Sequence, residues 1–492
     1  MPTERRVLVF GADGLRPDQI TPEIMPTLTR LAASGVRFDD FHSVYPTHTR
    51  VVATSFATGR TPGQHGVVAN TMIVPGATDD HIIDTGDYQH LDALAAFDPA
   101  GAQLVPTLSE ILGHHGARLA VAGTGSSGSN ALWTFKDRGR IVNTGTAYGL
   151  ADLYDLREKL GPVPDRAIPN EARNRYATSA VTDIYLRDPE ARVITLWLAE
   201  PDSTLHYTGI GSPETTQALR NVDACLDTVL TAMDRQGVRE QFDILFLSDH
   251  GHSTVRAHRT LREYLNEART DLGGSLPSLV TASDYIYAQP GTEEPTADAL
   301  APLVEWLHDQ LWVDVISGGT DDLAGLPGVL PLNALWNGST NHRRPLLAIS
   351  PRWSHEPNEF GVPGTVDSLT TQAALKSSHG SLSPYDLHCT FIAHGPSFRE
   401  GVVSSMPSGV TDVMPTILDS LGLDSPSGLD GRVLREAFAA TADPIVEKTN
   451  TVLTAPGATA GRVIIHRVEG TTYLHGSDRG GEFPLNAPPA DA

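Results

Sequence analysis

The sequence predicts an α/β protein with a mostly parallel central sheet, helices on both faces of that sheet, and an inserted cap subdomain. Short apolar runs recur along the 492 residues, and segments with helical spacing lie between them. The runs are nearly continuous and do not alternate with polar residues, which is typical of parallel strands buried on both faces. Strands that alternate with helices favour an open sheet with crossover connections.

Six segments are predicted to be strands, and three are predicted to be helices. Gly35 and Gly422 are expected to end two of the helices, and Thr411 is a candidate cap at the start of the last one. The strands are expected at residues 6–10, 117–123, 192–199, 242–248, 345–350 and 389–395, and the helices at 24–34, 213–236 and 411–422.

The chain is predicted to fold as a core in two pieces, interrupted by an insertion. The insertion is rich in Pro and Gly and contains one local helical pattern at 299–311. Near the C-terminus, Glu469 and Gly470 are expected to turn a β-hairpin, and a loose tail is expected after it. The predicted parts are residues 1–255 and 371–440 for the core, 256–370 for the cap subdomain, and 441–492 for the hairpin and tail.

The charge and the cysteine content limit the classes of partner. A net charge of −23 argues against general binding to nucleic acid or to an anionic membrane, although bound metal ions could still attract a small anion. Cys225 and Cys389 are the only cysteines, so no disulfide framework is expected. The N-terminal apolar run is too short for a signal peptide, and no run approaches the roughly 18 apolar residues of a membrane span. We expect a soluble, cytoplasmic protein.

Acidic residues follow three of the predicted strands. Asp13 follows the first strand, Asp202 follows the strand at 192–199, and Asp249 with His250 follows the strand at 242–248. A lone aspartate after a strand usually serves a turn or a helix start. Three of them at the carboxyl ends of strands in one sheet instead indicate a ligand site, because these ends line the crevice of an open α/β sheet.

Histidines near these aspartates indicate a metal site. Asp202 and His206 are four residues apart and would share one face of a helical turn. Asp249 and His250 are neighbours whose side chains are expected to point in different directions, and they could serve two ions about 4 Å apart. His379 lies on a loop rich in Gly and Ser. Carboxylate and imidazole donors favour zinc, with manganese as the alternative.

Dinucleotide binding is the competing interpretation of the first strand and its turn. The segment VLVFGADGLRPD begins like a dinucleotide-binding turn, but Asp13 occupies the place of the middle glycine. A carboxylate there would repel a phosphate unless a cation lay between them. The glycine-rich segment at 123–130 lacks the lysine of a phosphate-binding loop. Both observations argue against NAD.

The segment SVYPTHTR carries two candidate hydroxyl groups, on Thr47 and Thr49. Either threonine could begin the helix that follows. A capping box would need Glu or Gln three residues later, but Arg50 and Val52 stand at those positions. A nucleophilic role for one hydroxyl therefore stays open beside the capping role.

The ordered set of these residues resembles the alkaline phosphatase superfamily, and within it the type I phosphodiesterase/nucleotide pyrophosphatase branch. The set begins with Asp13 and a threonine of YPTHT. Further segments are similar to that branch, among them MPTLTRLAASGVRF, ATGRTPGQHGVVAN and TDVMPTILDSLGL, and the resemblance runs from about residue 5 to residue 440. The rest of the ordered set is Asp202-x-x-x-His206, Asp249-His250 and His379-Gly380.

The resemblance implies a site with two divalent metal ions, expected to be zinc, and a threonine nucleophile. It assigns Thr49 as the nucleophile that forms a phosphothreonine intermediate, and Asn70 as a contact of a phosphoryl oxygen. Thr47 is left as a loop residue. The resemblance further implies that Asp202, His206 and His379 hold one ion, and that Asp13, Asp249, His250 and the Thr49 hydroxyl hold the other.

The resemblance also implies a small anionic substrate that contains phosphate, and a phosphodiesterase or nucleotide pyrophosphatase activity. One departure concerns the substrate: the nucleotide pyrophosphatases have Phe-Pro-Asn after the nucleophile, whereas Arg50-Val51-Val52 follows Thr49 here. Phosphonate hydrolysis of the phosphonoacetate hydrolase kind and phosphomonoester hydrolysis are the alternatives within the superfamily. A sulfatase would need a C/S-x-P-x-R context, which is missing. The alternative outside enzymes is a metalloprotein that keeps its ions for stability or ligand binding.

Overall fold

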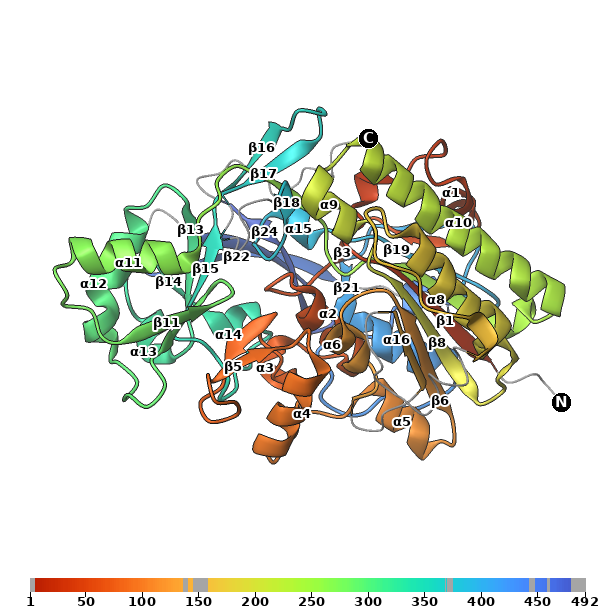
Figure 1. Cartoon of the computed structure of the whole chain (residues 1–492), viewed down its shortest axis with the longest axis horizontal. Coiled ribbons are helices and arrows are strands. Elements are labelled where there is room, and N and C mark those ends of the chain that lie inside the picture. Colours follow the sequence, from red (N-terminus) through yellow and green to blue (C-terminus); the bar gives the residue numbers. More distant parts are fainter. Residues whose placement is uncertain are drawn as a thin grey trace.

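The computed structural model describes residues 5–135, 140–144, 158–367, 369, 375–441, 447–457 and 461–478. Its centre is an eight-stranded sheet in the order β20-β2-β19-β9-β1-β8-β6-β7 (Figure 1). Among these strands β19 runs opposite to the other seven. The strands are β1 (Arg6–Ala12), β2 (Val36–Phe38), β6 (Arg118–Gly123), β7 (Arg140–Asn143), β8 (Ala191–Leu198), β9 (Phe242–Leu247), β19 (Phe391–His394) and β20 (Val402–Ser404).

Each face of the central sheet is buried under its own helices. Along β1, Val7 and Val9 belong to one hydrophobic cluster, and Leu8 and Phe10 belong to the other. Full burial of such side chains stabilises the fold by about 1.5–3 kcal/mol each, so both faces contribute. The first cluster includes α2 (Thr49–Thr58), α5 (Leu108–His114) and α16 (Val413–Ser420), and the second includes α1 (Pro26–Ser34), α8 (Glu171–Asp183) and α10 (Pro213–Gln236).

The predicted fold class is confirmed, and two predicted strands differ from the expected arrangement. The segment at 389–395 forms β19, which pairs antiparallel with both neighbours. The segment at 345–350 forms β15 (Leu347–Pro351), which belongs to a second sheet and pairs antiparallel with β12 (Tyr285–Ala288) and β13 (Val313–Gly318). A strand buried on both faces is apolar in either direction, so its composition does not report its orientation.

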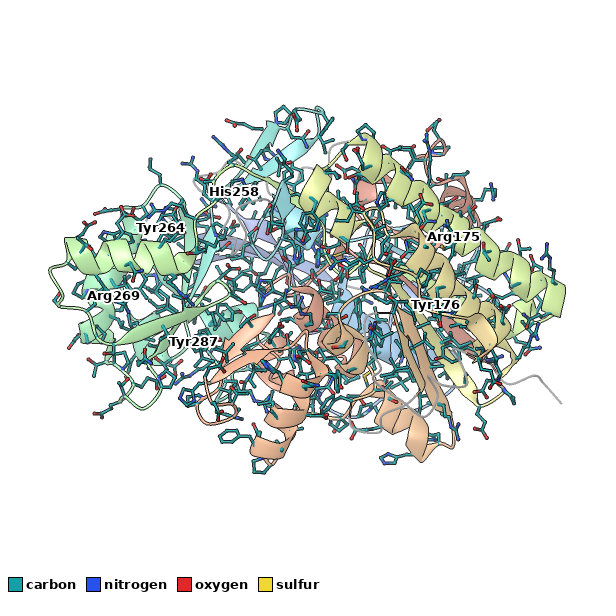
Figure 2. All side chains as sticks on the ribbon, in the orientation of Figure 1. Arg175, Tyr176, His258, Tyr264, Arg269 and Tyr287 are labelled. Carbon is teal, nitrogen blue, oxygen red and sulfur yellow. The ribbon has the colours of Figure 1, made fainter. Side chains whose placement is uncertain are left out.

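The second sheet, in the order β11-β12-β15-β13-β14, forms a lobe with its own core (Figure 1, left). Figure 2 shows Tyr264 and Tyr287 in this lobe, whereas Arg175 and Tyr176 lie on α8 at the other end of the molecule. The domain limits at 256 and 370 stay a prediction, and residue 370 lies outside the described residues. The lobe also contains β11 (Leu279–Ala282), β14 (Val329–Pro331), α11 (Leu261–Asp271), α12 (Ala297–His308), α13 (Asp321–Ala324) and α14 (Leu332–Leu335).

A three-stranded antiparallel sheet, β22-β23-β24, closes the described part of the chain. Glu469 and Gly470 have φ values of 52° and 89°, as a two-residue hairpin turn requires. These strands are β22 (Lys448–Thr454), β23 (Arg462–Val468) and β24 (Thr471–Ser477). The expected tail lies outside the described residues. None of the described helices has the length and apolarity needed to cross a membrane.

Short elements complete the described structure and carry several residues of the site. They are β3 (Phe41–His42), β4 (Thr71–Ile73), β5 (Ile82–Asp84), β10 (Ser253–Val255), β16 (Trp353–Pro357), β17 (Pro363–Val366), β18 (Ser377–Ser378), β21 (Ser408–Gly409), α3 (Pro62–His65), α4 (Tyr88–Phe97), α6 (Ser127–Ala131), α9 (Asp202–Thr208) and α15 (Pro384–Leu387). There are also 3-10 turns at Pro17–Gln19, Tyr185–Arg187, Arg239–Gln241, Val410–Asp412 and Arg435–Ala437.

Candidate metal centre

The predicted site residues meet at the carboxyl edge of the central strands. Asp13 directly follows β1, Asp249 lies two residues after β9, and Asp202 begins α9 shortly after β8. These strands are neighbours in the sheet, so their carboxyl ends lie side by side. Thr49 is the first residue of α2, and its side chain faces the same place.

One group of donors surrounds the Nε2 atom of His250. This atom lies 3.2 Å from Asp249 Oδ2, 3.5 Å from Asp13 Oδ1 and 3.2 Å from Thr49 Oγ1. All four residues are buried. Neighbouring side chains at a strand exit point in different directions unless the backbone turns, and here it turns after β9, so Asp249 and His250 meet at one point.

A second group surrounds the Oδ1 atom of Asp202. His206 Nε2 lies 3.2 Å from it, His379 Nε2 lies 3.4 Å from it, and His252 Nε2 lies 2.8 Å from it. His206 is on the same helical turn as Asp202, as the four-residue spacing predicts. The two groups adjoin, since the rings of His250 and His379 stack with centroids 3.6 Å apart.

His252 was missed by the sequence reasoning. It belongs with Asp202, His250 and His379 to one set whose donor atoms all lie within 4.8 Å of one another, and His206 reaches this set through Asp202. The spacing held a signal: His252 follows His250 by two residues, and residues two apart in extended backbone share a side.

Backbone carbonyl groups fix the rings of the three predicted histidine ligands. The Nδ1 atom of His206 lies 2.8 Å from the Ser377 carbonyl oxygen, that of His250 lies 3.0 Å from the Gly251 carbonyl, and that of His379 lies 2.6 Å from the Thr47 carbonyl. A carbonyl oxygen only accepts, so each Nδ1 must donate its hydrogen. In a neutral ring the lone pair is then on Nε2, as in histidines that bind metals.

His252 gives a sharper indication of a cation. The Ser377 hydroxyl donates to the Leu205 carbonyl oxygen at 2.7 Å, so it accepts from His252 Nδ1 at 3.1 Å. Burial lowers the pKa of His252 to about 4, so its Nε2 carries a lone pair near neutral pH. That lone pair lies 2.8 Å from a carboxylate oxygen of Asp202. Two acceptors this close repel each other unless a cation binds both.

The carboxylates of the site also need positive charge nearby. Burial raises the pKa of Asp13, and repulsion from Asp249 and Asp202 raises it further. Burial also raises the pKa of Asp249. Burial opposes ionisation of Asp202, but attraction to His206 holds the pKa of Asp202 well below its usual range. Asp13 Oδ1 and Asp249 Oδ2 are buried and make no hydrogen bond within the described part of the chain. These residues fit divalent metal ions.

Thr47 is more than a loop residue. Besides the bond from His379 to its carbonyl oxygen, its hydroxyl oxygen accepts from the Gly380 backbone N–H at 2.6 Å. Thr47 therefore holds both the ring and the backbone of the loop that carries His379. Its own side chain is fully buried.

Asn70 and Arg50 meet at the start of α2, next to Thr49 in the chain. Asn70 Oδ1 accepts from the Arg50 backbone N–H at 3.3 Å, which leaves the Asn70 amide group as a donor. The Arg50 guanidinium lies 3.4 Å from Asp84 Oδ1, and its side chain is 22% exposed. Arg50 is therefore paired with Asp84 and only partly buried.

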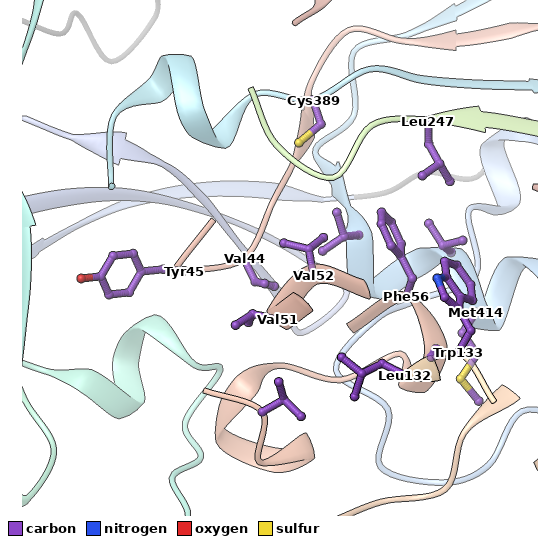
Figure 3. Close-up of a cluster of buried hydrophobic side chains, with 14 of the residues drawn as sticks. Val44, Tyr45, Val51, Val52, Phe56, Leu132, Trp133, Leu247, Cys389 and Met414 are labelled. Carbon is purple, nitrogen blue, oxygen red and sulfur yellow. The ribbon is translucent and has the colours of Figure 1, made fainter. Parts of the chain in front are cut away.

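Helix α2 is held rigidly behind Thr49. Figure 3 shows Val51, Val52 and Phe56 of this helix within the hydrophobic cluster. All three side chains are fully buried, and Phe56 stacks on Trp133 with ring centroids 5.8 Å apart. The buried helix fixes the place of the Thr49 hydroxyl, and its N-terminal amide groups favour an anion there.

A small pocket opens beside His379. Its wall combines residues of the lobe with residues of the metal-site loop, so the insertion shapes the space next to the site. The lining residues are Asp284, Pro351, Val366, Leu369, Ser378, His379, Ser381 and Asp386.

Known proteins from a snake and from human are similar to this chain. The venom phosphodiesterase CdcPDE of Crotalus durissus collilineatus is 24% identical over 262 residues, which are 51% of this chain and 27% of that protein. The ectonucleotide pyrophosphatase/phosphodiesterase family member 1 of Homo sapiens is 21% identical over 267 residues, which are 53% of this chain and 25% of that protein. The chain thus matches about a quarter of the length of these relatives.

A solved structure has the same fold. Murine ectonucleotide pyrophosphatase/phosphodiesterase 5, an inactive threonine-to-alanine variant in complex with AMP, matches with a TM-score of 0.60 at 17% identity. The match covers 86% of this chain and 97% of that chain. The family profile described as type I phosphodiesterase/nucleotide pyrophosphatase matches residues 7–345, which are more than half of this chain. The chain therefore belongs to the type I phosphodiesterase/nucleotide pyrophosphatase family.

Proposed function

We propose that this chain is a di-metal hydrolase of phosphoric diester or pyrophosphate bonds, with Thr49 as its nucleophile. One observation carries the proposal: the Thr49 hydroxyl lies at the N-terminus of a buried helix, 3.2 Å from His250 Nε2 and beside two buried aspartates. A free threonine hydroxyl is a weak nucleophile at neutral pH, so it needs activation of the kind that this surrounding can supply.

Two zinc ions are the proposed cofactors, with manganese as the alternative. Asp202, His206 and His379 would hold one ion, and His252 would bind it as a further ligand or orient Asp202. When bound, the ions would lower the pKa of the hydroxyl and neutralise charge on the reacting phosphate. Carboxylate and imidazole donors match the ligand preference of zinc. The other ion would be held by Asp13, Asp249, His250 and the Thr49 hydroxyl.

The chain's own residues would carry out two displacements at phosphorus. The Thr49 oxygen forms a bond to phosphorus while the bond to the leaving oxygen breaks, which gives a phosphothreonine. Water then attacks the phosphorus, and the Thr49 oxygen leaves as a hydroxyl. The Asn70 amide group and the first backbone N–H groups of α2 would donate to the phosphoryl oxygens throughout, which is electrostatic stabilisation by fixed donors.

A nucleotide-like phosphodiester or pyrophosphate is the proposed substrate class. The relatives are named as phosphodiesterases and nucleotide pyrophosphatases, and the murine structure contains AMP. Neither nucleic acid nor a membrane is a proposed partner, given the net charge of −23. A cytoplasmic location stays a proposal, supported by two buried free cysteines.

Arg50 favours a second candidate, a phosphonate hydrolase. Its guanidinium stands one residue after the nucleophile, where the nucleotide pyrophosphatases have phenylalanine. A partly exposed guanidinium suits a substrate with a second anionic group, such as the carboxylate of phosphonoacetate.

A substrate panel on zinc-loaded protein tests these candidates. It compares aryl phosphodiesters, aryl phosphomonoesters, dinucleotides and phosphonoacetate, each with the wild-type chain, Thr49→Ser and Thr49→Ala. We expect diester turnover that Thr49→Ser keeps in part and Thr49→Ala loses by at least about 1,000-fold. Equal turnover by Thr49→Ala would remove the nucleophile assignment. A fully loaded protein without any turnover would favour the non-catalytic metalloprotein.

A further inference from the structure

Four histidines and one aspartate form a cluster away from the metal centre, in which two histidines are buried and the other three residues are partly buried. Asp40 lies in the turn between β2 and β3, and His42 ends β3. The other three histidines come from the end of the described chain and from the residue after α15. They are His388, His466 on β23 and His475 on β24. We call these five residues the Asp40 cluster.

The side chains of this cluster converge on the Asp40 carboxylate. His42 Nε2 lies 2.7 Å from Asp40 Oδ1, His466 Nδ1 lies 3.4 Å from Asp40 Oδ2, and His475 Nδ1 lies 3.9 Å from Asp40 Oδ1. His388 Nε2 lies 3.3 Å from His475 Nδ1. The donor atoms of Asp40, His42, His466 and His475 all lie within 4.8 Å of one another.

The Nδ1 atom of His466 points to a cation beside the Asp40 carboxylate. His466 is 96% buried, since only 4% of it is exposed, and its Nδ1 faces Asp40 without a hydrogen bond within the described part of the chain. A neutral imidazole binds a metal through such a nitrogen atom, and a carboxylate oxygen beside it can bind the same ion.

We propose that the Asp40 cluster is a separate zinc site, formed by Asp40, His42, His466 and His475, with His388 beside it. Three imidazole nitrogens and one carboxylate oxygen are a common zinc ligand set. Ligands about 2.0–2.1 Å from a tetrahedral zinc lie about 3.3 Å apart. The distances of 2.7, 3.4 and 3.9 Å from Asp40 lie on both sides of that value, so small rotations of the side chains complete the site.

A purely hydrogen-bonded cluster is the competing explanation. Lys448 Nζ lies 3.3 Å from Asp40 Oδ2 and gives this carboxylate a positive neighbour. The Lys448 side chain is 33% exposed, so water screens this pair and it stabilises little. Among the described residues it also leaves the His466 Nδ1 without a hydrogen bond, whereas zinc would bind that atom and the carboxylate together.

The proposed ion would fasten the C-terminal hairpin to the strand that leads to the catalytic loop. His466 and His475 lie on β23 and β24, and His42 is five residues before Thr47. The hairpin has other anchors, since Tyr473 donates its hydroxyl hydrogen to Asp412 at 2.9 Å and the Ser477 N–H donates to the Leu382 carbonyl at 2.8 Å. Variants of the histidines should therefore still fold.

Zinc counting on the full chain tests this site. We expect His466→Gln and His475→Gln each to lose one zinc ion per chain relative to the wild type, by elemental mass spectrometry after dialysis. His258→Gln is the matched control, because His258 is exposed and belongs to neither group of proposed ligands. Unchanged zinc content in both cluster variants, with native circular dichroism, overturns the proposal.

Anomalous scattering from wild-type crystals at the zinc edge gives a test that needs no variant. A peak enclosed by Asp40, His42, His466 and His475 supports the site, and its absence from zinc-grown crystals overturns it. The same measurement on Asp202→Asn separates the two proposals. The peak at Asp40 should persist there, whatever happens to the ions of the catalytic centre.

Discussion

Thr47 connects the nucleophile loop to His379 through two of its oxygen atoms. Thr47→Val keeps the shape of the side chain and the bond from His379 to the carbonyl, but it removes the acceptor of the Gly380 N–H. Leaving this buried donor unpaired should cost about 1–3 kcal/mol and loosen the His379 loop. We expect zinc affinity, measured by competition with a chelator, to fall about 10–100-fold, as for other partners of metal ligands.

Thr58→Val is the matched control for Thr47. Thr58 is equally buried, and its hydroxyl donates to the Thr54 carbonyl oxygen at 2.7 Å within α2, so it does not contact the metal centre. The control should change stability only. Equal loss of zinc affinity in both variants would contradict the positioning role of Thr47.

His65 should make the stability of the fold depend on pH. Its Nδ1 accepts from the Val67 N–H at 3.2 Å, so its Nε2 donates to Ser55 Oγ at 3.1 Å, and the ring is neutral. Burial, aided by the charge of Arg343, lowers the pKa of His65 to about 3 from 6.5. Between pH 3 and pH 6.5 the unfolded chain therefore binds one more proton than the folded chain. The stabilising contribution of a neutral His65 is fully present above pH 6.5 and is lost as the pH falls towards 3.

The contribution of His65 can be measured as a difference in the slope of the free energy of unfolding against pH. In urea unfolding, the wild type should lose about 1.4 kcal/mol per pH unit below pH 6.5 from this group alone. His65→Asn should be less stable at pH 7.5 and should lose that part of the slope. A variant with the wild-type slope between pH 6 and pH 4.5 would contradict the assignment.

Sequence patterns pointed to the aspartates of the candidate site, but they did not point to the residues that hold other side chains of the site in place. Asp13, Asp202 and Asp249 follow strands, and a shared sheet edge brings such residues together. Thr47 and His252 contribute through contacts made by residues far along the chain, Gly380 and Ser377. No local period encodes such contacts, because they depend on how separate loops pack against one another.

At the scale of elements, helix α1 depends on a carboxylate from another helix. Its own first residues provide no side-chain cap. Asp223 of α10 instead accepts from the backbone N–H groups of Thr27 at 3.1 Å and Leu28 at 2.8 Å. Asp223 is 5% exposed, so Asp223→Ala leaves two buried donors unpaired. We expect a loss of about 2–3 kcal/mol in the free energy of unfolding, measured with urea.

Asp227 on the same helix is the control for Asp223. Its side chain is 59% exposed and lies 4.0 Å from an Arg30 side chain that is 69% exposed. Such a pair is screened by water, so Asp227→Ala should change stability by less than about 0.5 kcal/mol. Comparable losses in the two variants would mean that charge on α10 matters and the cap does not.

The elements differ in how far their sequence determines them. Helix α10 spans Pro213–Gln236 as predicted, because Ser212 accepts from the Thr215 N–H at its start and Gly237 adopts φ 66° at its end. The orientation of β19 was not predictable from its composition. Strand β19 lies between β9 and β2. This position depends on how the chain returns to the central sheet after the lobe, and a short segment of sequence does not specify that path.

At the scale of the whole molecule, the lobe and the core are joined by a buried ion pair. Arg343 lies between α14 and β15, and its Nη2 is 2.5 Å from Asp98 Oδ2, at the end of α4. The same guanidinium donates to the carbonyl oxygens of Gly101 at 2.6 Å and Ala102 at 2.7 Å. The Arg343 side chain is fully buried and that of Asp98 is 9% exposed, so water screens this ion pair only weakly.

Arg343→Met tests how strongly this contact couples the lobe to the core. Methionine fills a similar volume but removes the guanidinium that donates to Asp98 and to the Gly101 and Ala102 carbonyl groups, and removal of one partner from a buried pair costs about 3–5 kcal/mol. Arg344→Met is the control, because Arg344 pairs with a half-exposed Glu294 and should cost less than about 1 kcal/mol. Urea unfolding followed by both tryptophan fluorescence and circular dichroism checks the difference.

If the two midpoints separate only in Arg343→Met, the lobe has become an independent unit, because two-state unfolding requires the probes to coincide. Similar small losses in the two variants would contradict the coupling role of Arg343.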